Sequence, residues 1–389
     1  MFKNTESFPE NSGIPKDLFE LKAKLLCEGA NVDDEALQLF ESQNPSRVKR
    51  GGLSSGGKIQ LSDDLFVNFP FYKKRLTDLQ VLRDPEKELG LLIKQADALI
   101  AKGSVIKAPD WYRERVGGFD ITQIITAHNK QLATSVYESC DLFRTRNQCK
   151  FCVINTSLKD KNPNLIEKSP TLMLEALSKI PVAEYGGLTI NGGMTVNPGR
   201  GMELIEPVVK AVRESYPELP IAVEITPPED LEWIDRLAAA GTNSLMMNLE
   251  CWDNDVRKKI IPGKNKYCPR DLYLAALQRA VKVLGPGRVS SCFVVGGEPI
   301  DSLKQGIKAV IAQGAIPSPL AGRYFEEVPN YRFKPNASWR EFLEIQNFTK
   351  AELQKNGLCS TDQAGCVACK MCDMIKDLTR SGVIKSLLN

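Results

Sequence analysis

Three cysteines within a thirteen-residue stretch, Cys140, Cys149 and Cys152, are the side chains of this sequence best suited to chemistry. Eight residues separate the first pair and two separate the second. Three thiolates on one loop can bind three irons of a four-iron cluster and leave the fourth iron open, whereas a structural zinc site or a ferredoxin cluster normally takes four protein ligands. An open iron can bind a substrate or a cofactor. A zinc site and a chance grouping are the alternatives, and the single histidine, His128, lies twelve residues upstream.

The cysteine stretch resembles the cluster-binding loop of radical S-adenosylmethionine (SAM) enzymes, including an aromatic residue, Phe151, directly before the last cysteine. The first gap is longer than is usual in that superfamily. It is similar to the gap of an uncharacterised biotin-synthase-like subgroup, and the resemblance extends from the stretch near Arg50-Gly51-Gly52 to a cysteine-rich tail. The resemblance implies SAM and a four-iron cluster as cofactors, with Phe151 beside them.

A second group of cysteines, Cys359, Cys366, Cys369 and Cys372, lies near the C-terminus within fourteen residues. Its two successive two-residue gaps resemble a ferredoxin-type run. The group predicts an auxiliary four-iron cluster, and a four-thiolate zinc knot is the alternative, because thiolates suit both metals. Six residues separate Cys359 from the compact trio that follows, so we expect it to be the replaceable ligand.

Composition is that of an ordinary globular protein. The 389 residues are 42% hydrophobic and 25% charged, and the net charge of +3 gives no field of one sign that would favour nucleic acid. No apolar run approaches the roughly eighteen residues of a membrane span, and the first residues lack the apolar core of a signal peptide. We therefore expect a cytoplasmic protein that binds neither membrane nor nucleic acid, whose cysteines stay reduced.

Residues 1–120 form an N-terminal extension with mixed signals. Apolar spacing predicts helices over Asp17 to Leu26 and Asp33 to Phe40, and alternation predicts a hairpin over Lys58 to Phe71 with a turn at Ser62-Asp63-Asp64. Apolar residues near the helical period also predict a helix over Asp84 to Ala101.

Residues 121–322 alternate short apolar strands with helices, the pattern of a parallel sheet with crossover helices. The expected strands are Leu132 to Tyr137, Gly187 to Asn191, Ile221 to Ile225, Ser244 to Leu249, Val289 to Val295 and Ala315 to Leu320. The expected helices are Pro170 to Ile180, Gly201 to Ser215, Pro228 to Ala240, Pro269 to Leu284 and Ile300 to Gln313. Six units are too few for a closed eight-stranded barrel, so the fold class is α/β with a partial (β/α)6 TIM-type barrel, as in radical SAM enzymes. Residues 323–389, with a helix over Ser338 to Gly357, form a C-terminal segment that contains the second cysteine group.

The resemblance also suggests where SAM would bind. Asn191, Gly192 and Gly193 end the second strand and resemble the Gly-Gly-Glu element whose backbone receives the methionyl amino group, although Met194 replaces its acid. Val295 and Gly296 end the fifth strand and resemble the apolar, glycine-containing element beside adenine, with an ordinary strand-to-loop turn as the alternative.

Two carboxylates, Glu224 and Glu250, lie at the ends of the third and fourth strands. They are candidates for binding the ribose hydroxyls or the amino group of SAM. A structural ion pair is the alternative for each, because a charge inside an apolar strand is costly without a partner. No catalytic residue can be named from the sequence.

The leading function class is a radical SAM enzyme that abstracts hydrogen from an unactivated C–H bond, with sulfur insertion as in biotin and lipoyl synthases. That subclass rests on analogy of layout. The alternatives are peptide or cofactor modification with an electron-conducting auxiliary cluster, and a non-enzymatic iron–sulfur or zinc protein. The enzyme class implies a small-molecule or acyl/peptide substrate and an electron donor such as flavodoxin or ferredoxin.

Overall fold

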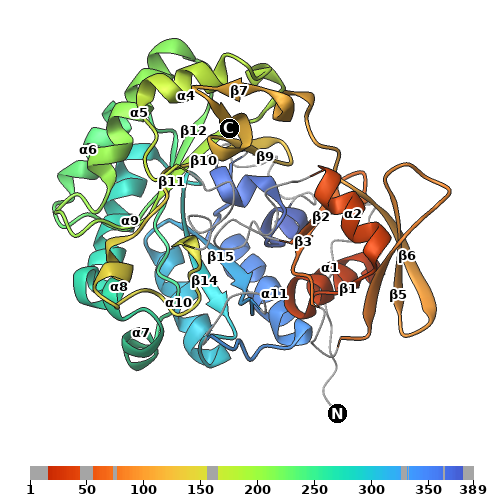
Figure 1. Ribbon diagram of the computed structural model, residues 1–389. Coiled ribbons are helices and arrows are strands. Elements are labelled where there is room, and N and C mark those ends of the chain that lie inside the picture. Colours follow the sequence, from red (N-terminus) through yellow and green to blue (C-terminus); the bar gives the residue numbers. More distant parts are fainter. Residues whose placement is uncertain are drawn as a thin grey trace.

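The computed structural model describes residues 16–43, 56–72, 77–155, 165–325, 331, 333–361 and 364–379. Within them, a six-stranded sheet near the N-terminus stands beside a seven-stranded sheet that curls into part of a barrel (Figure 1). The stretch near Arg50-Gly51-Gly52, where the predicted resemblance begins, lies outside the described residues. Along the described residues, none of the helices combines the length and the apolar composition that crossing a membrane requires.

The seven-stranded sheet has the order β15-β14-β13-β12-β11-β10-β9. Strands β10 to β15 are parallel and follow one another in chain order, and β9 pairs antiparallel with β10. The predicted partial (β/α)6 barrel is therefore confirmed, with one additional edge strand. The strands are β9 (Thr126–His128), β10 (Gln131–Tyr137), β11 (Leu188–Gly192), β12 (Ile221–Glu224), β13 (Ser244–Met246), β14 (Val289–Val295) and β15 (Ile316–Ala321).

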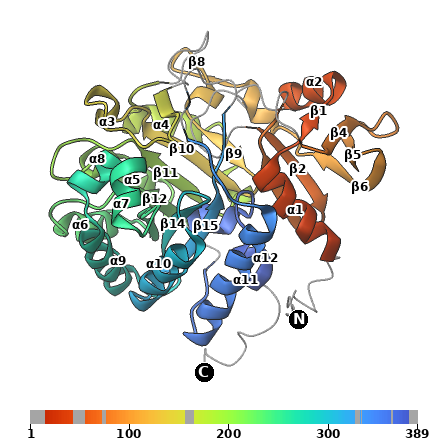
Figure 2. The same cartoon turned by 90° about the horizontal axis from the view of Figure 1, so that it is seen from below.

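Helices cover the outer face of this sheet, as Figure 2 shows from below. Each turns an apolar stripe inward; in α5, for example, Ile205, Val209 and Val212 are buried. The five predicted helices are confirmed as α4 (Pro170–Leu177), α5 (Met202–Ser215), α6 (Glu232–Ala239), α9 (Arg270–Leu284) and α10 (Ile300–Ala312). Three short helices were not predicted, namely α3 (Asp141–Arg144), α7 (Asn254–Ile260) and α8 (Pro262–Tyr267).

The N-terminal sheet has the order β1-β4-β5-β6-β2-β3. The predicted helices are confirmed as α1 (Lys16–Glu28) and α2 (Asp34–Gln43), and the predicted hairpin as β2 (Gly57–Ser62) and β3 (Leu65–Phe69). The other strands are β1 (Asn31–Val32), β4 (Leu79–Arg83), β5 (Gly90–Gln95) and β6 (Ala98–Val105), and a ribbon of β7 (Arg115–Val116) and β8 (Phe119–Asp120) follows them.

The predicted helix over Asp84 to Ala101 is wrong, because β5 and β6 form an antiparallel hairpin there. Leu91 and Ile93 are fully buried while Leu92 between them is half-buried, which is the two-residue period of a strand. The chain turns at Ala96, whose φ of 51° lies in the left-handed region. A dense apolar run fits both periods, and pairing with β4 decides in favour of the strand.

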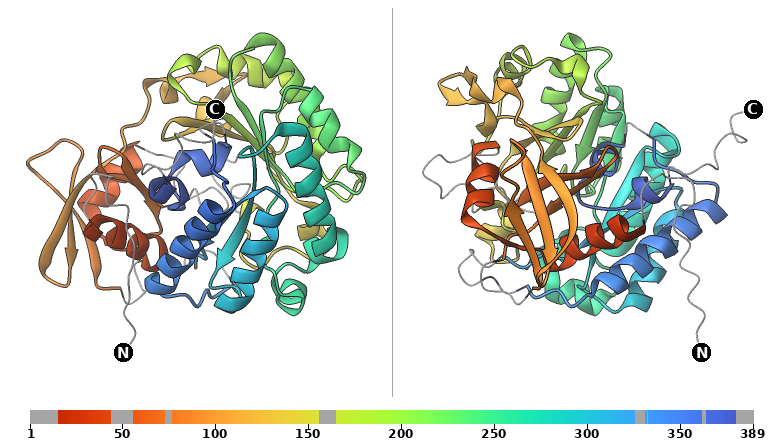
Figure 3. Two further views of the ribbon diagram at one scale, coloured as in Figure 1. Left: turned by 180° about the vertical axis from the view of Figure 1, so that it is seen from behind. Right: turned by 90° about the vertical axis from the view of Figure 1, so that its right-hand side faces the viewer.

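The cysteine-rich tail enters the concave side of the half-barrel. Helix α11 (Trp339–Lys355) begins at Ser338 with a capping box to Glu341 and packs against α10 and α1. The chain then forms a 3₁₀ turn, Gly365–Cys369, which contacts β10 to β13 from inside, and ends in α12 (Ile375–Thr379). In Figure 3 the blue tail lies within the curve of the sheet.

Close packing inside the barrel requires a glycine at position 365. A Cβ there would lie 2.6 Å from the Cβ of Ala222 on β12, and the φ of Gly365 is positive. Val367, one turn further, is fully buried against Met246 and Cys292. The tail therefore fills the lower part of the barrel interior and forms the floor of the space above it.

Residues of the N-terminal extension hold this tail in place. The ammonium of Lys22, on α1, is fully buried and donates to the Lys370 carbonyl and to Asp377 Oδ2, both at 2.6 Å. The backbone N–H of Asn68, on β3, donates to the Met371 carbonyl at 2.9 Å. The N-terminal extension thus acts as a clamp on the tail.

We expect Lys22→Met to lower the free energy of unfolding by about 3–5 kcal/mol, because it leaves Asp377 buried without its cation. Thermal and urea denaturation would measure the loss. Lys258→Met is the matched control, since the Lys258–Asp255 pair is exposed and its removal should leave the midpoint unchanged. Equal midpoints for the Lys22 variant and the parent would contradict the clamp.

Candidate active site

Two cavities meet inside the half-barrel, with volumes of about 260 and 300 Å³. The first is lined by Cys140, Cys149 and Cys152, and the second by Cys366, Cys369 and Cys372. Both are bordered by the same side chains, namely those of His128, Phe151, Asn191, Glu224, Asn248 and Glu250. We call the joined space the chamber, the first three cysteines the loop trio and the last three the tail trio. The fold brings two cysteine groups that are far apart in sequence to one chamber.

The loop trio follows the C-terminal end of β10, where parallel barrels place their sites. The Asp141 N–H donates to the Met194 carbonyl at 2.9 Å, which fixes the loop to the segment after β11. On its other side, the Lys150 N–H donates to the Ile260 carbonyl at 2.8 Å. Backbone hydrogen bonds to the segment after β11 and to the end of α7 therefore position the cysteine loop.

Burial governs the ionisation of the loop trio in the absence of metal. It raises the pKa of Cys140, raises that of Cys149 well above its usual value, and raises that of Cys152 to about 11. These thiols need a bound cation to become thiolates at neutral pH. Lys264 opposes the shift at each of them.

The loop trio suits an iron–sulfur cluster. Cys149 is buried, Cys140 and Cys152 are half-buried, and all three line the first cavity. The ligands of an iron–sulfur cluster bind different irons and do not converge on one point. The three thiols would hold three irons of a four-iron cluster and leave the fourth iron free to bind a cofactor.

Glu250 and Lys264 form a buried ion pair beside the loop trio, with an Nζ to Oε1 distance of 2.7 Å. Glu250 follows β13 with a φ of 69°, a conformation that costs energy for a residue with a side chain. Burial is the largest single influence and lowers the pKa of Lys264, but Glu250 and the neighbouring Tyr273 and Cys149 together outweigh it and raise the pKa well above its usual value. Lys264 is therefore a fixed cation of the site, which the sequence analysis missed because α8 was not expected.

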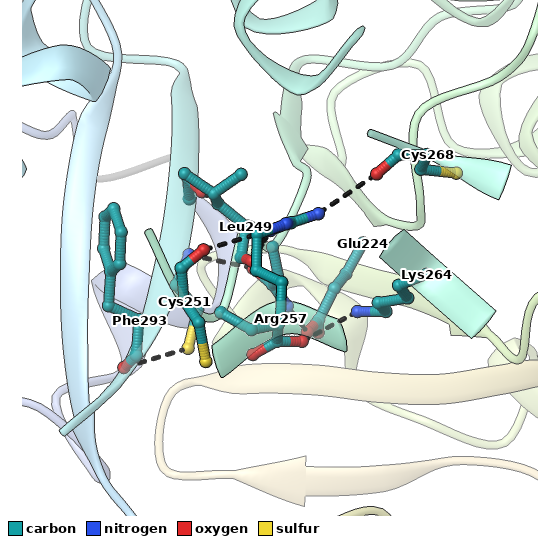
Figure 4. A network of polar contacts seen from close by, with 11 residues as sticks. Glu224, Leu249, Cys251, Arg257, Lys264, Cys268 and Phe293 are labelled. Carbon is teal, nitrogen blue, oxygen red and sulfur yellow. Dashed lines mark hydrogen bonds and ion pairs between the residues drawn. The ribbon is translucent and has the colours of Figure 1, made fainter. Parts of the chain in front are cut away.

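A fully buried arginine, Arg257, lies beside this pair and holds the backbone around it (Figure 4). Its guanidinium donates to the carbonyls of Leu249 and Cys251, at 2.7 and 3.0 Å, and to the Cys268 carbonyl at 3.1 Å. Leu249 and Cys251 flank Glu250, and Cys268 follows the helix that carries Lys264. One side chain thus fixes both backbone segments that supply the ion pair.

Glu224 stands at the boundary between the two cavities. Asn248 Nδ2 donates to Glu224 Oε1 at 2.7 Å, and Cys366 Sγ lies 3.6 Å from Glu224 Oε2. The Cys292 N–H in turn donates to Asn248 Oδ1 at 3.0 Å, which fixes the amide. Burial raises the pKa of Glu224. Asn248 was missed by the sequence analysis, because a single amide between apolar residues gives no pattern.

Some of the other residues predicted to bind SAM line the chamber, and the rest do not. Asn191, Gly192 and Gly193 line the loop-trio cavity, and a Cβ on Gly193 would lie 1.5 Å from the Ser139 carbonyl, so the glycine permits close approach of the cysteine loop. Val295 is buried in β14 and Gly296 packs against Asn336 and Ala337, and neither lines the chamber.

Cys359 is separated from the tail trio. Its carbonyl oxygen would lie 2.5 Å from a Cβ on Gly287, just before β14 begins, and Cys359 lines neither cavity of the chamber. Gly287 is at the opposite end of the strand from the loop trio. Cys359 and the tail trio, which the sequence groups together, therefore lie toward different ends of the barrel.

The fold and site define a class of enzyme, in which a partial (β/α)6 barrel carries a three-cysteine loop after its first parallel strand. Residues 140–310 match the model of the radical SAM superfamily. The chain belongs to that superfamily, whose members use SAM and a four-iron cluster.

Individual relatives are distant. The chain is 28% identical over 320 residues to bacteriochlorophyllide c C-7(1)-hydroxylase of Chlorobaculum limnaeum, covering 74% of this chain and 79% of that protein. A radical SAM methyltransferase from Sphaerobacter thermophilus is 17% identical, with a TM-score of 0.44 over 74% of this chain and 77% of that one. HydG, a maturase of the [FeFe]-hydrogenase, is 15% identical with a TM-score of 0.44 over 64% of this chain, which spans about half of HydG (53%).

Changing Cys140, Cys149 and Cys152 together to Ala should remove about four irons per chain and abolish SAM cleavage, because no thiolate would remain in the first cavity. Iron analysis and detection of 5′-deoxyadenosine would measure both effects. Metal bound at the tail should persist. Cys27→Ala, which removes a buried thiol outside the chamber, is the control and should retain all iron. SAM cleavage by the triple variant would contradict the assignment.

Proposed function

We propose that this protein abstracts hydrogen from an unactivated C–H bond of a substrate held between the two cysteine trios. The observation that carries the proposal is that the two cavities share lining residues, so that both trios border one space. When bound, a reduced four-iron cluster and SAM supply a 5′-deoxyadenosyl radical, which takes the hydrogen atom. The chain's residues hold the substrate, orient it and exclude water.

The tail trio would hold a second iron–sulfur cluster with three protein ligands. Cys366, Cys369 and Cys372 line the second cavity, and burial raises the pKa of Cys369 to about 12, so these thiols also need a cation to ionise. Arg323 interacts favourably with a Cys372 thiolate. With Cys359 at the other end of the barrel, the fourth position of this cluster would face the chamber.

The lining of the second cavity suggests the kind of substrate. Met246, Val294, Leu320 and Phe325 supply apolar surface, which favours an apolar, ring-bearing or acyl portion of a small molecule. Arg323 is buried at the same wall, and its guanidinium suits a carboxylate. An anionic molecule with an extended apolar part fits this combination.

The likeness to a bacteriochlorophyllide hydroxylase favours hydroxylation of the carbon from which hydrogen is removed. In that outcome the oxygen would come from water, which loses a proton to solvent, and the substrate radical would pass one electron to an oxidised iron–sulfur cluster. Sulfur insertion is the second candidate outcome, and the specific observation behind it is a tail trio that leaves one cluster position facing the substrate space. Either outcome needs a low-potential one-electron donor of the flavodoxin or ferredoxin kind, and both fit a cytoplasmic enzyme.

The proposal is tested by anaerobic reconstitution of the full chain with iron and sulfide, followed by reduction with dithionite in the presence of SAM. We expect about eight irons per chain from the ligand count and formation of 5′-deoxyadenosine. With a deuterated substrate, deuterium should appear in the 5′-deoxyadenosine. Intact SAM after prolonged reduction of the fully loaded protein would refute the enzyme class.

Cys366→Ala, Cys369→Ala and Cys372→Ala should each lose about four irons and keep the cluster of the loop trio. SAM cleavage should therefore continue while product formation stops. Iron content, electron paramagnetic resonance and product analysis would measure these effects.

Cys359→Ala is the matched control within the same segment and should keep about eight irons and form product, because its side chain is remote from the chamber. Loss of the auxiliary iron in this variant would show that the second cluster has four cysteine ligands. One zinc ion recovered with four irons would make the tail a structural metal site.

A further inference from the structure

We propose that the Lys264–Glu250 pair, which lines the same cavity as Cys140, Cys149 and Cys152, sets the reduction potential of the cluster that these cysteines hold. In this proposal Lys264 acts on the cluster through its charge. The inference rests on the superfamily assignment and does not depend on the identity of the substrate.

The pair is buried deeply enough for its field to act strongly. The side chains of Lys264 and Glu250 are 15% and 8% exposed, so water screens them weakly. Both residues line the loop-trio cavity together with all three of its cysteines. A charge in this place acts on the cluster at short range.

Backbone contacts hold the pair against the cysteine loop. The Gly263 N–H, next to Lys264, donates to the Asn147 carbonyl of the cysteine loop at 2.9 Å. A Cβ on Gly263 would lie 2.5 Å from both that carbonyl oxygen and a methyl group of Leu142, so the start of α8 and the cysteine loop are in direct contact. Arg257 fixes the segments on either side of the pair, as described above.

The other charged groups of this cavity are engaged with partners of their own. Glu138 lies 3.8 Å from Lys168, and Glu224 accepts from Asn248. Reduction of the bound cluster adds one electron from a low-potential donor and no proton, so its net negative charge rises by one. A cation beside the cluster stabilises the reduced form more than the oxidised form.

The test is the midpoint potential of the loop-trio cluster, measured without SAM by redox titration followed by electron paramagnetic resonance. The Cys366→Ala background leaves one cluster to titrate. We expect Lys264→Met to make the potential more negative by about 59 mV, a tenfold loss in the equilibrium constant for one-electron reduction. Lys264→Arg, which keeps the charge, should retain most of the parental potential.

Changes at Glu250 should shift the midpoint potential in the opposite direction. Glu250→Gln leaves the Lys264 cation without its counter-ion and should raise the potential, whereas the double change Lys264→Met with Glu250→Gln should return it toward the parental value. A merely structural role would not give shifts of opposite sign that cancel. Iron content, measured on each variant, separates loss of the cluster from a change in its potential.

An unchanged SAM-free potential in Lys264→Met, together with weaker SAM binding, would overturn the proposal and make Lys264 a SAM ligand. If Lys264→Met assembles no cluster, Glu250→Gln decides, since a potential that does not rise in that variant also overturns the proposal. Neither result bears on hydrogen abstraction, because the titration contains no SAM and no substrate.

Discussion

A half-closed barrel leaves its concave face and one edge open to water, and this structure covers both with segments from opposite ends of the chain. The tail from Gly365 fills the lower interior, and the N-terminal extension clamps that tail through the buried Lys22 ammonium. The chamber exists because this filling stops at the tail trio. Its floor and its second set of thiols therefore depend on the contacts of α1 and β3 with the tail, and the ion pair between α1 and α12 is the fully buried one among them.

The site is built at the ends of strands, where the backbone has to leave the sheet and side chains can converge. Glu224 and Glu250 end neighbouring strands, and each has acquired a different partner, an amide for the first and an ammonium for the second. The cost of burying each carboxylate is offset locally. Both carboxylates border both cavities, whereas Lys264 lines only the loop-trio cavity and Arg323 lines only the other, so the cations differ between the two.

The sequence predicted the parallel strands and the loop trio because both depend on local pattern. Periodicity identifies a strand such as Val289–Val295, and spacing identifies Cys140, Cys149 and Cys152. It failed over Asp84 to Ala101, where sheet pairing overrides an apolar run that also fits a helix. Lys264 and Asn248 could not be predicted, since their roles arise from contacts across the fold, and the separation of Cys359 from its neighbours depends on how the tail threads the barrel.

The ion pair between Lys22 and Asp377 joins residues that are 355 positions apart. During synthesis on the ribosome, the barrel and the loop trio emerge long before the segment that completes the chamber. The order of metal loading follows from this delay. A cluster at the loop trio can be inserted while the half-barrel still lacks its tail, whereas any metal that the tail trio binds has to wait until that last segment has been made.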